Sequence, residues 1–288
     1  MTAASAALAA WTAQTPEERK ATGFPLPPIV HTKWNDRTSI PHRAQECVDG
    51  WQIKNPSATV LVWTDADTNA FVQLHFPAWW PVYSRLPRNV MKVDIVRNML
   101  LAVYGGVWAD IDACPLRPLS DWGLGASDKL VVGTEADMES SVWPTHFARK
   151  FQFCTWTFAS VPGHPVMAEF LHRTGAKLDE RRNTSGAYSP PITDGDVLDF
   201  TGISMTGPGM FTDAVFSYLG QHGDTSFDAM HFMPSRMHFG DATVLPLWQF
   251  SPGSTQTGTS RPTYSRNHLD PEALVLHLFL GSWRDGKY

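Results

Sequence analysis

The sequence predicts an α/β fold in which one mostly parallel sheet is flanked by helices. Two short runs of apolar, β-branched residues, at 29–31 and 59–63, indicate buried strands. Between them, apolar residues recur at helical spacing over residues 41–54. Strand, helix and strand in this order are typical of parallel strands joined by a covering helix. With 288 residues and a hydrophobic fraction of 43%, the chain can form one large domain with a sizeable core.

The clearest helix is expected over residues 90–104, where apolar side chains form a broad stripe that Gly105 and Gly106 end. Residues 1–28 are expected to be an N-terminal extension of a single domain at 29–288, and their opening lacks the basic segment of a signal peptide. The other expected elements are strands at 107–112, 130–133 and 274–278, a helix at 163–173, a helix that begins near Phe211, and loops at 183–200 and 251–270.

Composition excludes some classes of function and leaves others open. The net charge of -5 disfavours a nucleic-acid partner, because such proteins carry basic surfaces. No run of about 18 apolar residues encodes a membrane span, so the chain is expected to be a Golgi-luminal fragment or a cytoplasmic protein. Cys47, Cys114 and Cys154 show no metal-binding spacing, which favours three buried thiols; one disulfide with one free thiol is the alternative.

Asp110 and Asp112 are the strongest candidates for chemistry. At the end of the strand expected at 107–112, side chains two residues apart would point the same way and face one ligand. Ligands of parallel sheets bind beyond the carboxyl ends of the strands. Two carboxylates there suit Mn²⁺ or Mg²⁺ bridging a diphosphate. Because Asp-x-Asp also arises by chance, a solvated turn is the alternative when the pattern stands alone.

Asp94 and Arg97 strengthen the hypothesis, since their spacing puts them on one face of the helix that precedes this strand. A guanidinium group can bind phosphate or sugar hydroxyls through a fixed fork of donors, and a carboxylate can accept from sugar hydroxyls. The alternative is a surface ion pair of small energetic value.

The stretch from Asp94 to Asp112 resembles the sugar-binding region of glycosyltransferase family 32, which includes fungal initiation-specific alpha-1,6-mannosyltransferases. The resemblance extends over residues 29–283 through several ordered motifs. These are Ile29–Trp34, Trp51 with Asn55-Pro56 and Leu61–Trp63, Tyr104–Asp112, Gln152–Trp156 with Gly163–Pro165, Thr206–Asp213, and His277 with Gly281–Trp283.

The resemblance implies a GT-A fold, a retaining reaction, and a metal held by Asp110 and Asp112. It also implies that Asp94 and Arg97 bind the donor sugar and its phosphate. His277 is expected to be a third metal ligand or a diphosphate contact, the alternative being a buried histidine satisfied by the backbone. Ser282 and Trp283 are expected to close over the diphosphate, the alternative for Trp283 being an anchor in the core.

Three aromatic residues near the start, His31, Trp34 and Trp63, are candidates for stacking on the nucleotide base, with core packing as the alternative. Glu135 follows an expected strand and is a candidate acceptor contact. Asp213 is a candidate substrate contact after a glycine-containing turn, or a cap of the helix expected near Phe211.

These residues predict a metal-dependent hexosyltransferase that uses a nucleotide-diphosphate sugar. The resemblance favours mannose from GDP-mannose, while related enzymes use UDP-sugars; the acceptor hydroxyl is left open between a glycan, a lipid and a small molecule. A non-catalytic protein that binds sugar nucleotides or carbohydrate is the main alternative. A nucleotidyltransferase ranks last, because no glycine-rich phosphate loop follows the first expected strand.

Overall fold

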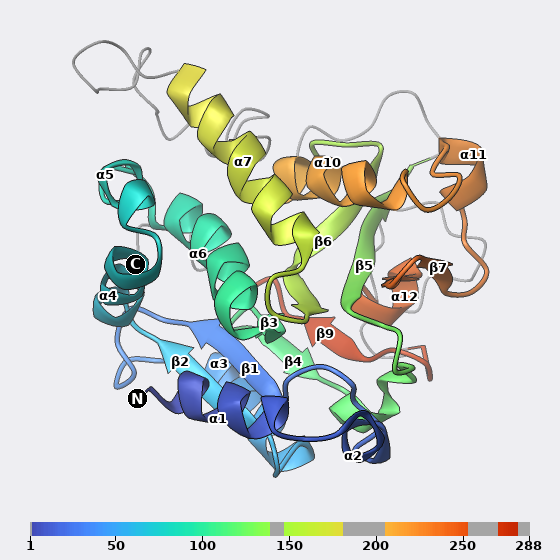
Figure 1. The fold of residues 1–288 in the computed structure, drawn as a ribbon, viewed down its shortest axis with the longest axis horizontal. Helices are drawn as coiled ribbons and strands as arrows, with labels where there is room; N and C mark the ends of the chain where they lie inside the picture. Colours follow the sequence, from blue (N-terminus) through green and yellow to red (C-terminus); the bar gives the residue numbers. More distant parts are fainter. Residues whose placement is uncertain (1, 139–146, 181–204, 253–269, 282–288) are drawn as a thin grey trace.

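The computed structural model describes residues 2–138, 147–180, 205–252 and 270–281 (Figure 1). Its centre is a seven-stranded sheet in the order β2-β1-β3-β6-β5-β8-β7. The pairings β1–β2, β1–β3 and β5–β8 are parallel, so five strands run one way, and only β6 and β7 oppose them. The strands are β1 (Ile29–Lys33), β2 (Thr59–Trp63), β3 (Gly106–Ala109), β5 (Leu130–Asp137), β6 (Phe151–Ser160), β7 (Met237–Phe239) and β8 (Ala242–Leu245).

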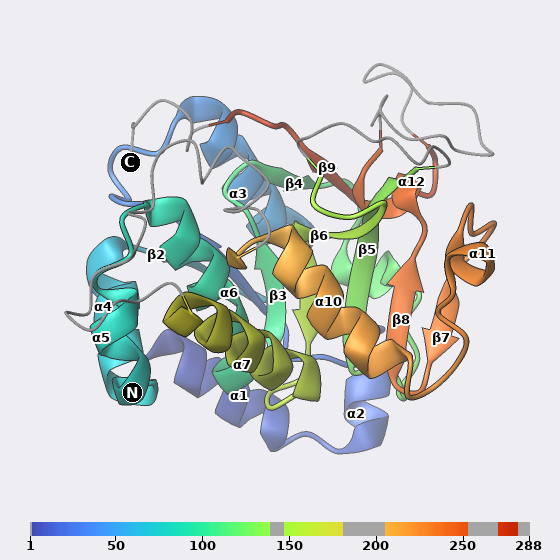
Figure 2. The same ribbon diagram turned by 90° about the horizontal axis from the view of Figure 1, so that it is seen from above.

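Helices cover both faces of this sheet, which confirms the α/β class that the sequence predicts (Figure 2). Helices α6, α7 and α10 lie on one face, and α3 and α12 lie on the other. The helices are α1 (Ala3–Thr12), α2 (Pro16–Ala21), α3 (His42–Lys54), α4 (Asp65–His75), α5 (Trp80–Tyr83), α6 (Asn89–Tyr104), α7 (Pro165–Glu180), α10 (Pro208–Leu219), α11 (Phe227–Met230) and α12 (Leu247–Phe250), with 3-10 turns η1 (Pro77–Trp79) and η2 (Leu119–Trp122).

Alternation along the strands divides the core between the two faces. In β5, Leu130 and Val132 pack with the residues of α6, α7 and α10, whereas Val131 packs with Trp51 of α3 and Phe250 of α12. Successive side chains of a strand point to opposite faces, so an uninterrupted apolar run is what a sheet covered on both sides requires.

The junction between α6 and β3 depends on two glycines. Gly105 ends α6 with φ of 62°, and Gly106 follows with φ of 94°, a left-handed conformation that L side chains rarely adopt. A Cβ on Gly106 would also collide with the backbone oxygen of Ile29 in β1. The expected end of the helix is therefore confirmed, and the close approach places β3 directly beside β1.

Several local expectations are corrected. The strand expected at 107–112 ends at Ala109, and Asp110–Asp112 form a turn in which the Ala113 amide donates to the Asp110 carbonyl at 2.8 Å. The chain then continues in β4 (Ala113–Pro115), which pairs antiparallel with β9 (Val275–His277) in a separate ribbon.

The residues that follow β2 begin a helix. The Thr64 hydroxyl accepts from the Asp67 amide at 3.2 Å, and the Asp67 carboxylate accepts from the Thr64 amide at 2.8 Å. This reciprocal capping box begins α4, so residues that favour turns here serve as a cap.

The favoured assignment of three buried thiols is wrong for two of the cysteines. Cys47 of α3 and Cys114 of β4 form a disulfide, while Cys154 remains a buried thiol.

The N-terminal residues pack onto the domain. Ala4 and Trp11 of α1 are buried, and α1 contacts β1, β2 and α6. Within the described ranges, no helix has the length and apolar character needed to cross a membrane.

Candidate active site

The site is built where β3 ends. The Asp110 amide still donates to the Trp156 carbonyl of β6 at 2.7 Å, which prolongs the sheet by one residue before the chain turns. The Asp110 carboxylate accepts from the Trp108 indole at 2.7 Å and lies 3.6 Å from the Arg97 guanidinium. About a quarter of this side chain (26%) is exposed, so the carboxylate is held by protein donors and still reaches solvent.

Asp112 occupies a more enclosed position, with 8% of its side chain exposed. One carboxylate oxygen lies 3.0 Å from the His277 Nε2, and the other accepts from the Leu280 amide at 2.8 Å. Burial by itself raises the pKa of Asp112, but the His277 hydrogen bond and charge, together with the Leu280 amide, outweigh it and hold the pKa below its ordinary value. Asp112 is therefore ionised at neutral pH, as a cation ligand must be.

His277 is fixed by aromatic neighbours. Its ring stacks on Trp156 at 4.7 Å between centroids, with planes 11° apart, and Phe279 meets it edge-on at 4.1 Å. Its Nδ1 is buried and has no hydrogen-bond partner among the described residues. The structure thus brings His277 to Asp112, with Nε2 directed at the carboxylate.

Asp94 and Arg97 meet the turn from α6, and both are almost fully buried. Their side chains lie 3.0 Å apart, and Arg97 also donates to the Val93 and Thr155 carbonyls. Burial raises the pKa of Asp94 to about 6, and Arg97 and the Thr206 hydroxyl only partly offset it. Because both residues are buried, the pair is not the surface ion pair that was the alternative. It holds the Arg97 guanidinium beside Asp110.

Glu135 approaches the same region from β5. The β5–β6 pairing shifts register around it, and its carboxylate accepts from the Gln152 side-chain amide at 2.8 Å. Burial raises the pKa of Glu135 to about 7; the Gln152 bond and the charges of His277 and Arg97 oppose that rise, and Asp110 adds to it. The charges of His277, Arg97 and Asp110 therefore all act on the Glu135 carboxyl group.

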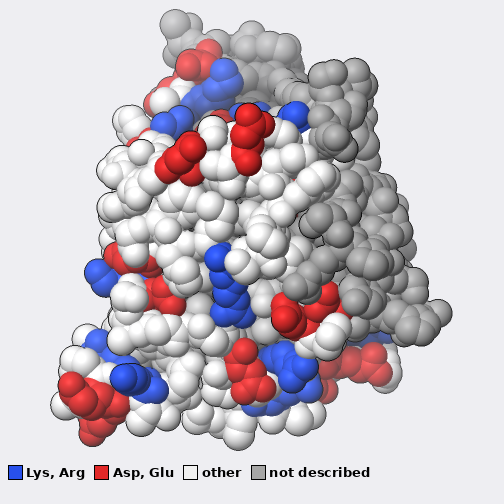
Figure 3. Space-filling model, turned by 90° about the vertical axis from the view of Figure 1, so that its right-hand side faces the viewer, with Lys and Arg blue, Asp and Glu red and all other residues white. Residues whose placement is uncertain are grey.

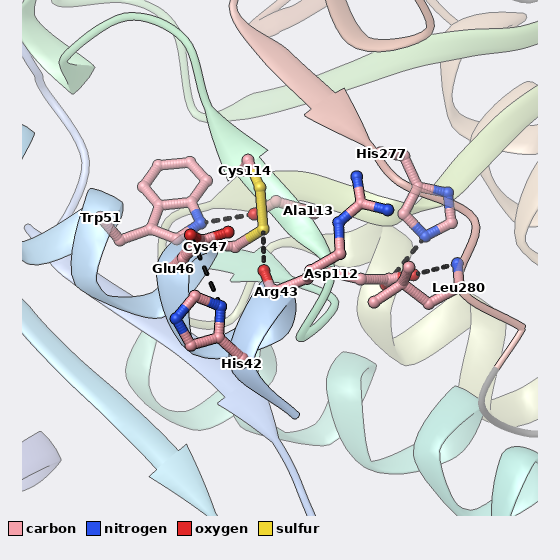
Figure 4. The surroundings of a disulfide bond; sticks show 10 residues. All are labelled: His42, Arg43, Glu46, Cys47, Trp51, Asp112, Ala113, Cys114, His277 and Leu280. Carbon is pink, nitrogen blue, oxygen red and sulfur yellow. Dashed lines mark hydrogen bonds and ion pairs between the residues drawn. A yellow bond between two sulfur atoms is a disulfide. The ribbon is translucent and has the colours of Figure 1, made fainter. Parts of the chain in front are cut away.

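A disulfide supports the ribbon that carries Asp112 (Figure 4). Cys114 lies two residues after Asp112 and is bonded to Cys47 of α3. The Trp51 indole of the same helix donates to the Ala113 carbonyl at 2.8 Å. On its other side, Ala113 pairs with His277 in β9. Asp112 is therefore anchored from α3 on one side and from β9 on the other.

The donor set fits a hard divalent cation that the substrate helps to coordinate. Among the residues that the structure describes, no three His, Cys, Asp or Glu side chains lie close enough to hold an ion alone. Mg²⁺ commonly uses one or two carboxylates and takes its other ligands from phosphates and water. A carboxylate offers about four acceptor positions, and those of Asp112 carry one hydrogen bond on each oxygen, so coordination capacity remains.

The aromatic residues near the start lie in the core. His31 is fully buried, with one ring nitrogen 3.0 Å from the Gly105 carbonyl and the other accepting from the Trp63 indole at 3.1 Å. Burial lowers the pKa of His31 to about 4, so the ring is neutral. Trp34 is buried against Ile111, which is the residue between Asp110 and Asp112 in the turn. For His31 and Trp63 these contacts favour core packing over stacking on a base.

Asp213 forms a bidentate ion pair with Arg149, at 2.8 and 2.5 Å. Because α10 begins at Pro208, Asp213 lies in its second turn, and the expectation that it caps this helix is wrong. Ser282 and Trp283 lie outside the described residues.

Sequence reasoning missed the residues that hold the expected ones in place. Each acts through an ordinary hydrogen bond or ring contact, and all of these except the Trp108–Asp110 bond join segments that are distant in sequence. The residues are Trp108, Gln152, Thr155, Trp156 and Thr206. All five lie within motifs of the resemblance, which is the only signal in the sequence that points to them.

Comparison with known proteins confirms the resemblance. Residues 41–129 match the model of the family described as "Glycosyltransferase sugar-binding region containing DXD motif". The chain is 34% identical over 245 residues to the initiation-specific alpha-1,6-mannosyltransferase of Schizosaccharomyces pombe, an alignment that covers 82% of this chain and 58% of that protein. The Candida albicans protein of the same name is 29% identical over 292 residues, covering 91% of this chain and 73% of that one.

Among solved structures, the glycosyltransferase PaToxG is similar, with a TM-score of 0.43, 13% sequence identity, and coverage of 76% of this chain and 79% of that one.

Proposed function

This chain belongs to the glycosyltransferases whose sugar-binding region contains the DXD motif, and from that premise we propose that it transfers a hexose from a nucleotide-diphosphate sugar to a hydroxyl acceptor. Mannose from GDP-mannose is the favoured donor, because the S. pombe and C. albicans relatives are named mannosyltransferases. A glycan hydroxyl is the favoured acceptor, ahead of a lipid or a small molecule.

One observation carries the proposal: the carboxylate of Asp110 lies beside a buried guanidinium, in the same turn as an ionised Asp112. Asp110 and Asp112 would hold Mn²⁺ or Mg²⁺, which when bound neutralises charge on the diphosphate. Arg97 would donate to a phosphate oxygen of the donor, since three protein contacts already fix its position. Asp94 would accept from a sugar hydroxyl.

Glu135 would contact the acceptor near the reacting carbon. With a pKa of about 7, it holds its proton for much of the time at neutral pH and can donate to, as well as accept from, an acceptor hydroxyl. In the retaining reaction that we propose, the acceptor attacks the face that the diphosphate leaves. Such a route relies on positioning and electrostatic stabilisation more than on a strong protein base.

The test is a screen of sugar nucleotides for hydrolysis and transfer, with Mn²⁺ present or removed by chelation. We expect turnover of GDP-mannose that requires the metal, and its loss in Asp110→Ala and Asp112→Ala with the circular dichroism spectrum unchanged. Asp49→Ala, which removes an exposed carboxylate on α3, is the matched control and should keep full activity.

Full activity in chelator, or in either site variant, would contradict the proposal. Tight binding of a sugar nucleotide without any turnover would instead select the non-catalytic alternative.

A further inference from the structure

A second concave site lies at the opposite end of the β4–β9 ribbon from Asp112. Its volume is about 580 Å³, within the range of about 300–1,000 Å³ typical of ligand pockets. Four segments distant in sequence meet there: residues 117–123, 234–236, 246–249 and 271–274. Leu274, at its edge, precedes β9, so the cavity lies about 10 Å along that strand from His277, at about 3.3 Å per residue.

The polar groups of this cavity are held in position by the protein. The Arg236 Nε donates to the Gln249 side-chain oxygen at 2.9 Å, and its guanidinium also bonds the Trp122 and Gly123 carbonyls. Arg117 donates to the Pro271 carbonyl at 2.7 Å. Guanidinium groups fixed in this way present their remaining N–H donors at defined positions, which favours recognition because little side-chain entropy is left to lose.

The charges around the cavity balance. Arg117 and Arg236 are matched by Asp121 and Glu272. A phosphate-rich ligand would meet two carboxylates as well as two guanidinium groups, and a purely apolar ligand could not bond to the hydrogen-bonding positions that these charged groups still offer. A neutral ligand rich in hydroxyl groups matches the mixture, because each hydroxyl both donates and accepts.

Trp248 adds a small apolar area to this polar set, since 8% of the residue is exposed. Its indole N–H donates to the Glu272 carboxylate at 3.3 Å, which fixes the ring in the cavity wall beside Pro246 and Leu274. An indole beside alternating donors and acceptors suits a sugar ring, which has an apolar C–H face and polar edges. On the side of the molecule that carries β7, the described surface shows positive and negative side chains among uncharged areas (Figure 3).

We propose that this cavity is a subsite for a neutral oligosaccharide, which holds a part of the acceptor away from the reacting hydroxyl. The assignment of the ligand as acceptor rests on the proposed function, whereas the binding chemistry rests on the cavity alone. The ribbon links the two sites physically, since Leu274 at the cavity and His277 beside Asp112 bound the same short strand.

The experiment measures binding to the full chain by ligand-observed NMR titration, without metal or sugar nucleotide. The probe is mannotetraose, with glycerol and inorganic tripolyphosphate as comparators. We expect mannotetraose to bind, and Arg117→Ala and Glu272→Gln to raise its Kd about ten-fold each, the usual effect of losing a hydrogen bond to a charged group. Arg85→Ala removes an exposed arginine that does not line the cavity, and should leave the Kd unchanged.

The transfer reaction gives a second readout. The same two variants should raise the KM for an oligosaccharide acceptor and leave metal-dependent hydrolysis of the donor unchanged. Tighter binding of tripolyphosphate than of mannotetraose, or equal Kd values in all variants, would overturn the proposal. Because the titration needs no catalysis, a chain that binds mannotetraose here and turns over no sugar nucleotide would refute the proposed function alone.

Discussion

At the scale of single residues, the two aspartates of the motif differ in how they are held. Asp110 takes its donors from side chains of α6 and β3, whereas Asp112 takes a ring nitrogen and a backbone amide from β9 and the residues after it. The backbone amide cannot be removed by substitution, but His277 can. Substituting His277 therefore changes how Asp112 is oriented while leaving the Asp112 carboxylate in place.

We expect His277→Ala to weaken the binding of Mn²⁺ at the site. Groups that orient a metal ligand typically contribute 10–100-fold to metal affinity, so the Mn²⁺ concentration for half activation should rise by roughly ten-fold or more. The measurement is activity against Mn²⁺ concentration at saturating donor. His277→Gln, which keeps a side-chain donor, should recover part of the loss. An unchanged Mn²⁺ requirement in both variants would show that Asp112 is positioned without this histidine.

Glu135 gives a prediction about pH. Its pKa is about 7 in the folded protein against an ordinary value of 4.5, so between these pH values the folded state keeps a proton that the unfolded state has lost. Stability from this group is complete below pH 4.5 and is lost as the pH rises through 7. Glu135→Gln removes this dependence.

Thermal unfolding should therefore show a higher midpoint for Glu135→Gln than for the parent above pH 7, and nearly equal midpoints near pH 4.5. Glu17→Gln, which removes one exposed carboxylate from α2, controls for the change of net charge. A midpoint difference that stays constant across this range would mean that burial does not raise the pKa of Glu135.

At the scale of elements, β4 has three residues and, within the described ranges, pairs only with the equally short β9, so this pairing alone cannot hold it in position. The Cys47–Cys114 disulfide and the Trp51–Ala113 hydrogen bond both join it to α3, a helix of 13 residues. These two links hold the strand that follows Asp112 against α3, which is itself packed into the core.

Removing the disulfide should lower both the free energy of unfolding and the affinity of the site for its metal. The cysteines are 67 residues apart, and closing a loop of that length stabilises a folded protein by about 2–4 kcal/mol. Cys47→Ser with Cys114→Ser should lower the free energy of unfolding by that amount, measured with urea, and raise the Mn²⁺ requirement. Reductant should reproduce both effects in the parent and change nothing in the double variant. A loss of stability at an unchanged Mn²⁺ requirement would limit the disulfide to a structural role.

At the scale of the whole molecule, elements with a strong local signal were predictable. The helix ending at Gly105-Gly106 is one, because its apolar stripe and its end signal agree, and the buried strands β1 and β2 are others. Residues 110–112 were expected to continue the strand. They leave it because the last bond to β6 is the one from the Asp110 amide to the Trp156 carbonyl, 46 residues away, after which a local bond from Ala113 to Asp110 closes the turn. The Cys47–Cys114 pairing was missed for the same reason, since spacing alone does not bring α3 to β4.

Whether the first 28 residues belong to the folded domain is also a question at the scale of the whole molecule. Trp11 of α1 is 9% exposed, and the Arg19 guanidinium lies 3.9 Å above its ring while its Nε donates to the Trp11 carbonyl. A helix that buries a tryptophan in this way contributes to the stability of the domain it covers.

We therefore expect Trp11→Ala to lower the free energy of unfolding by about 3 kcal/mol, the lower end of the usual cost of removing a buried tryptophan. Hydrolysis of the donor per folded molecule should not change, because α1 contacts β1, β2 and α6 and supplies no residue of the candidate site. Leu74→Ala, at a leucine that is 73% exposed, is the control and should cost almost nothing. If the two variants unfold alike in urea, the extension is independent of the domain that begins at residue 29; if Trp11→Ala alone is destabilised, the folded unit includes α1.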